Sequence, residues 1–171
     1  MEFIKIVNSN DAVLPGLNFT MREFYSPRYP KPPIGHEFNL LKCLPLALQV
    51  IRDHYREKYK NLTWIVTCTL RHGNDDFSSH KNCVDSIPGS NVVEVMADIQ
   101  KNFISWENSE LVHKILTTGT NVMIIENGCL HLGWRTNKLD HHKGYPIEDF
   151  YIGFWQPSKV NIYGTNISYS H

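Results

Sequence analysis

The sequence predicts an α+β fold, and three observations lead to that prediction. Apolar residues recur at three- and four-residue spacing between residues 38 and 59, which is the pattern of a helix with one buried face. This helix is followed by a strand-like apolar run, WIVTCT, at residues 64–69. Farther on, Asn127-Gly128 stands between two apolar runs and signals a two-residue hairpin turn. Helix, strand, further helices and hairpin in this order are typical of an α+β fold.

Length, composition and charge narrow the class of protein. The chain has 171 residues, of which 42% are hydrophobic, so we expect one globular domain over residues 1–171. Seventeen basic and seventeen acidic residues give a formal net charge of zero. Because binding to phosphates needs clustered lysine and arginine, the charge pattern argues against nucleic acid as the main partner.

The sequence carries no pattern of a targeting or membrane segment. The start, MEFIKIVNSND, lacks the basic and long apolar regions of a signal peptide. No window approaches the roughly 18 apolar residues that a membrane span needs. We therefore expect synthesis in a cytoplasm without a signal peptide, with release by another factor if the protein acts outside the cell.

The cysteines and most histidines have ordinary interpretations. The four cysteines form no C-x-x-C pair, which argues against a structural zinc knuckle. Cys43, Cys68 and Cys129 stand in apolar surroundings, where cysteine usually behaves as a small hydrophobic residue. Nine histidines are many for this length, and His141-His142 is interpreted as part of an exposed loop because its surroundings are polar and turn-like.

Before the long helix, the sequence predicts a short edge strand at residues 2–7 and a helix start at residues 18–24 (NFTMREF). In the latter, Thr20 is the expected N-cap, and Glu23 stands three residues on, as in a capping box. Four prolines between residues 26 and 35 then predict extended coil.

The long helix is expected at residues 38–59, capped by Asn39. Pro45 is expected within its first two turns, where the missing N–H costs least. Its buried face is predicted to comprise Leu40, Leu41, Leu44, Leu48, Ile51 and Tyr55.

After a turn at residues 87–90, helical spacing predicts helices at residues 91–103 and 109–116, the second capped by Ser109. Further strands are expected at residues 122–126, 129–135, 150–155 and 160–163.

A polar segment after the first strand carries the candidate chemistry. It contains His80 and Asp85, and imidazole and carboxylate groups are good zinc ligands. Loops at strand ends let such side chains converge, so we predict a hydrolytic metal site here. His131, in the strand that returns from the hairpin, is the candidate third ligand. The competing interpretation is a structural histidine, because a lone histidine on a strand is more often structural than a ligand.

Two further residues are candidates for catalysis. Glu126 precedes the hairpin turn, and a carboxylate near a metal-bound water can take its proton and pass it to the leaving amine. Arg71 can hold a substrate carboxylate or an oxyanion through its planar fork of donors. The competing interpretations are a solvated turn carboxylate and a surface arginine near Asp75 or Asp76.

Several phrases in the chain match motifs of one enzyme family. Residues 18–24 match N-F-T-x-x-E-F, residues 51–55 match I-R-D-x-Y, and residues 65–71 are similar to I-x-V-T-S-G-Y-R. Residues 78–85 stand beside S-x-H-x-x-G-x-A-x-D, and residues 126–134 are similar to a glutamate followed by W-x-H. Residues 18–135 as a whole resemble the D-alanyl-D-alanine carboxypeptidase family of zinc peptidases, which includes VanX-type dipeptidases, the Hedgehog fold and phage endolysins.

The resemblance implies a Hedgehog-like α+β fold, a small antiparallel sheet with flanking helices, with residues 136–171 as an extension of the same domain. It implies Zn²⁺ held by His80, Asp85, His131 and a water. It also implies Glu126 as general base, Arg71 as a substrate or transition-state contact, and Ser78 at the substrate. The expected substrate is a peptidoglycan stem or crosslink peptide, cleaved by a phage or viral protein after its release or within the virion.

The chain departs from the family pattern at the ligand loop. Between His80 and Asp85 it is two residues shorter, it lacks the motif glycine, and Cys83 stands near the alanine position. The shortening either moves Asp85 out of ligand range or brings Cys83 in as a thiolate ligand. Two alternatives follow: an inactive member of the fold that serves as a structural or binding module of a virion, or a thiol hydrolase that pairs Cys83 with His80.

Overall fold

The computed structural model describes residues 17–24, 36–69, 83–134, 141–142, 145–146, 150–156 and 159–165. The expected edge strand at residues 2–7 and the proline-rich coil at residues 26–35 lie outside the described residues.

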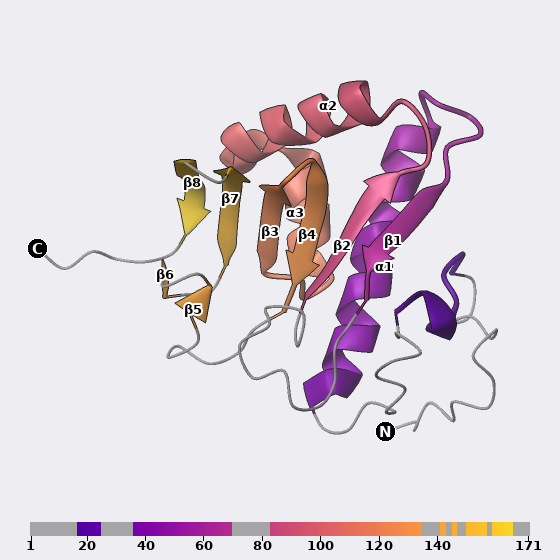
Figure 1. Cartoon of the computed structure of the whole chain (residues 1–171), viewed down its shortest axis with the longest axis horizontal. Coiled ribbons are helices and arrows are strands. Elements are labelled where there is room, and N and C mark those ends of the chain that lie inside the picture. Colours follow the sequence, from indigo (N-terminus) through magenta and orange to yellow (C-terminus); the bar gives the residue numbers. More distant parts are fainter. Residues whose placement is uncertain are drawn as a thin grey trace, which may run out of the picture.

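A six-stranded sheet organises the fold, with the three α-helices packed against one of its faces (Figure 1). All neighbouring strands are antiparallel except β3 and β7, which are parallel. This architecture confirms the predicted α+β class, with a mostly antiparallel open sheet. The strand order is β1 (Trp64–Cys68), β2 (Cys83–Pro88), β4 (Cys129–Gly133), β3 (Val122–Glu126), β7 (Tyr151–Gln156) and β8 (Lys159–Thr165).

The helices of the described residues follow the predicted pattern closely. The long helix is α1 (His36–Arg56), and α2 (Val92–Ile104) and α3 (Glu110–Thr117) confirm the two later helices. Two 3-10 turns, η1 (Met21–Glu23) and η3 (Trp106–Asn108), accompany them. A separate two-stranded ladder joins β5 (His141–His142) to β6 (Tyr145–Pro146), where the sequence predicted a loop.

The main core lies between the helices and one face of the sheet. Strand alternation turns Leu130 and Leu132 of β4 toward this core, and both are fully buried. From the helix side, α1 contributes Leu44, Leu48, Ile51 and Tyr55, all buried as predicted. The opposite face of the sheet carries the polar residues of the candidate site beside a smaller apolar cluster.

The predicted capping pair, Thr20 and Glu23, is in contact and forms one half of a capping box, because the Glu23 N–H bonds to the Thr20 carbonyl and not to its hydroxyl. The Thr20 backbone N–H and hydroxyl both donate to Glu23 Oε2, at 2.6 and 2.9 Å. Phe19 and Phe24 pack edge to face, with ring centroids 6.2 Å apart. This segment forms a 3-10 turn, and both aromatic rings are buried in the core.

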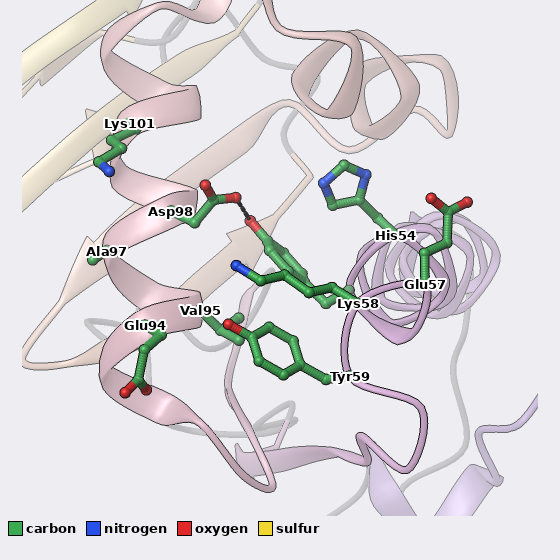
Figure 2. Close-up of a pocket in the computed structure, with 10 residues that line it drawn as sticks. His54, Glu57, Lys58, Tyr59, Glu94, Val95, Ala97, Asp98 and Lys101 are labelled. Atoms are coloured by element: carbon green, nitrogen blue, oxygen red, sulfur yellow. Dashed lines mark hydrogen bonds between the residues drawn. The ribbon is translucent and has the colours of Figure 1, made fainter.

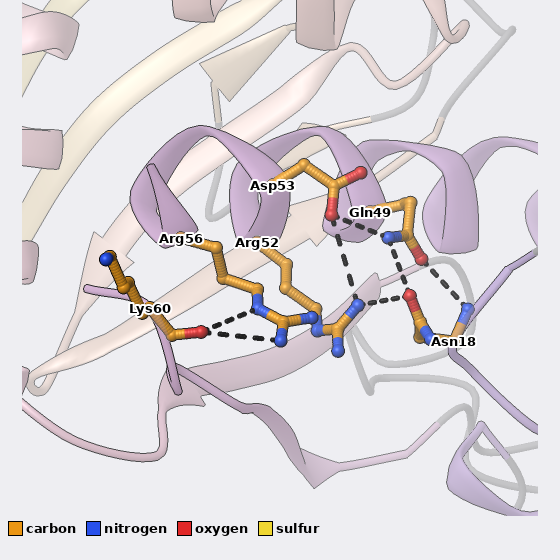
Figure 3. Close-up of polar contacts among 6 residues, drawn as sticks. All are labelled: Asn18, Gln49, Arg52, Asp53, Arg56 and Lys60. Carbon is orange, nitrogen blue, oxygen red and sulfur yellow. Dashed lines mark hydrogen bonds and ion pairs between the residues drawn. The ribbon is translucent and has the colours of Figure 1, made fainter. Parts of the chain in front are cut away.

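Hydrogen bonds of Asn18 connect this N-terminal segment to α1 (Figure 3). Its backbone N–H donates to Gln49 Oε1 at 2.9 Å, and Gln49 Nε2 donates back to Asn18 Oδ1 at 3.1 Å. Arg52 also donates to Asn18 Oδ1, and Gln49 bridges to Asp53 at 2.9 Å. The residues that match N-F-T and I-R-D are therefore in contact with each other, which gives these two motifs a structural role.

Two predictions about α1 are wrong. The helix begins at His36, so Asn39 lies inside it and does not cap it. Pro45 consequently lies in the helix interior, past the first two turns, where the ring removes the N–H that would bond to the carbonyl four residues earlier. Pro45 is buried against the core, and the apolar contact offsets part of that loss.

The hairpin prediction is confirmed in detail. Asn127 and Gly128 both have positive φ, 50° and 77°, as a type I′ turn requires. The turn joins β3 to β4 and pairs Glu126 with Cys129. It thereby fixes the register of the strand that carries His131.

Asp85 lies on a strand and not in a loop, which corrects the sequence prediction. β2 extends through Ile87 and Pro88, which had been assigned to a turn, and the chain bends only at Gly89 and Ser90. β2 lies between β1 and β4 and pairs with both, so this segment is held by two ladders that the local sequence does not announce.

Within the described ranges, no helix is long and apolar enough to cross a membrane.

Candidate functional site

The register of four strands brings the candidate residues into one row. Asp85 of β2 pairs with His131 of β4, His131 pairs with Ile124 of β3, and Ile124 pairs with Gly153 of β7. Because Leu130 and Leu132 face the helices, His131 and its row lie on the opposite face of the sheet. Two of the three predicted metal ligands therefore meet at the centre of that face.

Asp85 and His131 are in direct contact. Their closest atoms, Asp85 Oδ1 and His131 Nδ1, are 2.5 Å apart, although the residues are 46 positions apart in the chain. The His131 side chain is 1% exposed and that of Asp85 is 25% exposed. The imidazole is thus sealed from solvent, while the carboxylate keeps one side open to it.

The surroundings of His131 favour its protonated form. Desolvation on burial is the largest single influence and lowers the pKa of His131. The charges and hydrogen bonds of Cys83 and Asp85 together outweigh burial and raise this pKa to about 10. The protonated imidazole is therefore stabilised at this position.

Three more polar side chains, those of Cys68, Glu126 and Cys129, lie on the strands around Asp85 and His131. Burial raises the pKa of the Cys129 thiol, the charges of Asp85, Cys68 and Glu126 raise it further, and a hydrogen bond with Thr67 lowers it. Cys68 pairs with Asp85 across β1 and β2. Glu126 is half-buried and shares the site face with Ile124, two residues before it on β3. The predicted general base thus lies near the predicted ligands.

Asp85 and His131 carry donor atoms of the types that bind zinc. A tetrahedral zinc bound at about 2.0–2.1 Å separates two donor atoms by about 3.3 Å. The two atoms are 2.5 Å apart, so they would have to separate by about 0.8 Å to hold the ion between them. A carboxylate and an imidazole are also a ligand pair that zinc accepts.

The remaining predicted site residues, Arg71, Ser78 and His80, lie outside the described residues. Among the residues that the structure does describe, no group of three histidine, cysteine or acidic side chains has the arrangement of a metal site. Cys83, Asp85 and His131 alone thus do not form such a group. The third ligand predicted from the sequence, His80, remains a prediction.

Tyr151 and Trp155 of β7 form an aromatic wall beside the row. Their rings pack edge to face with centroids 5.9 Å apart, and Trp155 Nε1 donates to Tyr151 Oη at 3.1 Å. Gly153 lies between them, and a Cβ there would be 2.9 Å from Tyr151 Cε1. The sequence predicts a strand at residues 150–155, but nothing local reveals that β7 pairs with β3.

A separate pocket lies on the helix side of the molecule (Figure 2). It has a volume of about 500 Å³ and lies between α1 and α2. Tyr55 Oη donates a hydrogen bond to Asp98 at 2.8 Å, and the lining also includes Lys58, just past the end of α1, and Lys101 of α2. Charges of both signs line it, and none of the predicted site residues does.

Comparison with protein-family models, with curated proteins and with solved structures finds no match for this chain.

Proposed function

We propose that this protein is a zinc-dependent peptidase, with Asp85 and His131 as two ligands of the metal and His80 as the third. The observation that carries the proposal is the 2.5 Å contact between Asp85 and a fully buried His131 on the face of the sheet away from the helices. Folding brings these two ligand types together from distant parts of the chain, at the pairing that the strand register dictates.

The residues of the site divide the chemistry among them. A bound zinc supplies Lewis acidity to a water and to the substrate carbonyl. Glu126, on the same face near Cys129, accepts the proton of the attacking water and delivers it to the leaving amine. Arg71 contacts the substrate or its developing oxyanion, and Ser78 contacts the substrate.

The proposed substrate is a peptidoglycan stem or crosslink peptide. Support for this choice comes from the resemblance of residues 18–135 to the D-alanyl-D-alanine carboxypeptidase family. The structure adds that the N-F-T and I-R-D motifs of that resemblance are in mutual contact through Asn18 and Arg52. We further propose that the protein is encoded by a phage or other virus and acts on the cell wall after release or from the virion.

Four variants test the proposal. His131→Ala and Asp85→Ala are expected to lose both bound zinc and hydrolysis of purified peptidoglycan. Glu126→Gln is expected to keep zinc and to lose hydrolysis by about 100-fold or more, as for a general base. His113→Ala is the matched control, because His113 is an exposed histidine on α3 that bonds only locally to the Glu107 carbonyl, at 2.8 Å.

Two outcomes would contradict the proposal. Hydrolysis by Glu126→Gln at the wild-type rate would remove Glu126 from the mechanism. Wild-type protein that holds no zinc and hydrolyses no peptidoglycan would favour the alternative of an inactive structural or binding module.

A further inference from the structure

Cys83 shares the site face with Asp85. The two residues are two apart on β2, so their side chains project from the same side of the strand. Across the ladder, Asp85 is opposite His131 and Cys83 is opposite Gly133, which places Cys83 diagonal to His131.

The Cys83 side chain contacts His131 and is sealed from solvent. The diagonal register brings the Cys83 thiol beside the His131 ring, where it helps to raise the pKa of that ring, and the 2.5 Å contact of the ring is with Asp85. Cys83 has 0% exposure and also packs in a small apolar cluster on this face of the sheet with Val122, Ile124, Tyr151 and Trp155. Cys83 and Asp85, two residues apart on β2, therefore both lie against the buried imidazole of His131.

We propose that Cys83 is a positioning residue, whose buried thiol fixes the orientation of the His131 imidazole at the metal site. The inference rests on the proposed function for the identity of the metal ligand, but the contact itself is a feature of the metal-free fold. An imidazole turns about two bonds, and contact with Asp85 alone leaves the ring free to tilt. The second contact, from Cys83, removes that freedom.

Two other roles for Cys83 fit the structure less well. A nucleophilic thiol has to reach a substrate carbonyl, and Cys83 has no exposed surface. A thiolate ligand would complete a three-donor group with Asp85 and His131, and the described residues contain no such group with metal-site geometry. Neighbours of a metal ligand commonly act by orienting it, and their loss costs about 10- to 100-fold in metal affinity or activity.

Cys83→Ala, Cys83→Ser and a control, Cys43→Ala, test the role by zinc competition titration. Cys83→Ala is expected to bind zinc about 10-fold more weakly, and Cys83→Ser to recover most of that loss because its hydroxyl can still hydrogen-bond. Cys43 is a buried cysteine of α1 near Gly119, on the helix side of the sheet, so Cys43→Ala should leave zinc affinity unchanged. Equal affinity in Cys83→Ala and wild type would overturn the proposal.

Cobalt substitution separates positioning from ligation. We expect the cobalt-loaded wild type to show d–d bands of an oxygen and nitrogen site, shifted in Cys83→Ala and restored in Cys83→Ser. A sulfur-to-cobalt charge-transfer band that disappears in both Cys83 variants would show that Cys83 is a ligand, and would overturn the positioning role.

NMR resonances of the His131 ring in the metal-free protein test the positioning role of Cys83 even if no metal binds. We expect Cys83→Ala to change the ring ¹⁵N and proton shifts and Cys83→Ser to restore them, with Cys43→Ala like the wild type. If the shifts change in this way but the protein binds no zinc, the peptidase proposal is refuted and the contact between Cys83 and His131 stands. Unchanged His131 shifts in Cys83→Ala would refute the positioning role, whatever the metal result.

Discussion

Replacing Asp85 with alanine should destabilise the metal-free protein. The change removes the acceptor 2.5 Å from His131 Nδ1, and the His131 side chain is 1% exposed, so water in bulk cannot replace it. Leaving one buried polar group without its partner costs about 1–3 kcal/mol, and breaking a fully buried ion pair about 3–5 kcal/mol. Because Asp85 is itself 25% exposed, a water can enter the vacated space, and we expect a loss of about 2–3 kcal/mol.

The assay is urea unfolding in the presence of a chelator, which removes any contribution from bound metal. For a chain of this size, a loss of 2–3 kcal/mol in the free energy of unfolding would also lower the melting temperature by about 4–12 °C. Asp85→Asn keeps an acceptor oxygen and should lose about 1 kcal/mol. Asp53→Ala is the control, because the Asp53 side chain is 60% exposed, and its removal should cost no more than about 0.5 kcal/mol.

The result that would refute this reasoning is an Asp85→Ala protein as stable as, or more stable than, the wild type without metal. It would mean that Asp85 does not hold the buried imidazole, and the geometric basis of the candidate site would be lost.

Three further predictions concern the scaffold. Burial and a hydrogen bond to Asp98 raise the pKa of Tyr55, so its hydroxyl stabilises the fold fully below the unfolded pKa of about 10 and less above it. The free energy of unfolding of wild type should exceed that of Tyr55→Phe by about 1 kcal/mol at pH 8. In urea titrations this difference should shrink above pH 10. Ser109→Ala removes the side-chain cap of α3 and should cost about 1–2 kcal/mol in the same assay; an unchanged midpoint would exclude the cap. Gly164→Ala would place a Cβ 2.5 Å from Trp106 Nε1 and should cost about 1–3 kcal/mol with a shift in tryptophan fluorescence; wild-type stability and emission would contradict that packing.

The sequence predicted best where the signals are local. The hairpin followed from Asn127-Gly128, whose backbone angles only a few residue types adopt easily. The cap of α3 followed from Ser109, because a serine side chain can satisfy a free N–H of the first turn within its own neighbourhood. Each of these features depends on residues that are within four positions of one another.

Prediction failed where distant segments decide the outcome. Asp85 was assigned to the polar loop that follows the first strand, yet pairing with β4, more than 40 residues away, makes it part of a strand. The position of Pro45 was misjudged because the helix begins at His36, earlier than the apolar pattern indicates.

The contact between Asp85 and His131 lies between these two cases. The residue types and the face of His131 could be predicted from the sequence, because alternation with Leu130 and Leu132 is a local pattern. The pairing of Asp85 with His131 could not, because it depends on strand register, and a slip of one residue would turn Asp85 toward the helices.

The zinc content of the purified protein tests the central claim most directly. Elemental analysis of wild type, His131→Ala and His113→Ala, each purified without chelator and equilibrated with zinc, compares the three chains under one condition. The proposed site predicts about one zinc per chain in wild type and His113→Ala and almost none in His131→Ala. No zinc in the wild type, or the same content in His131→Ala, would contradict the account.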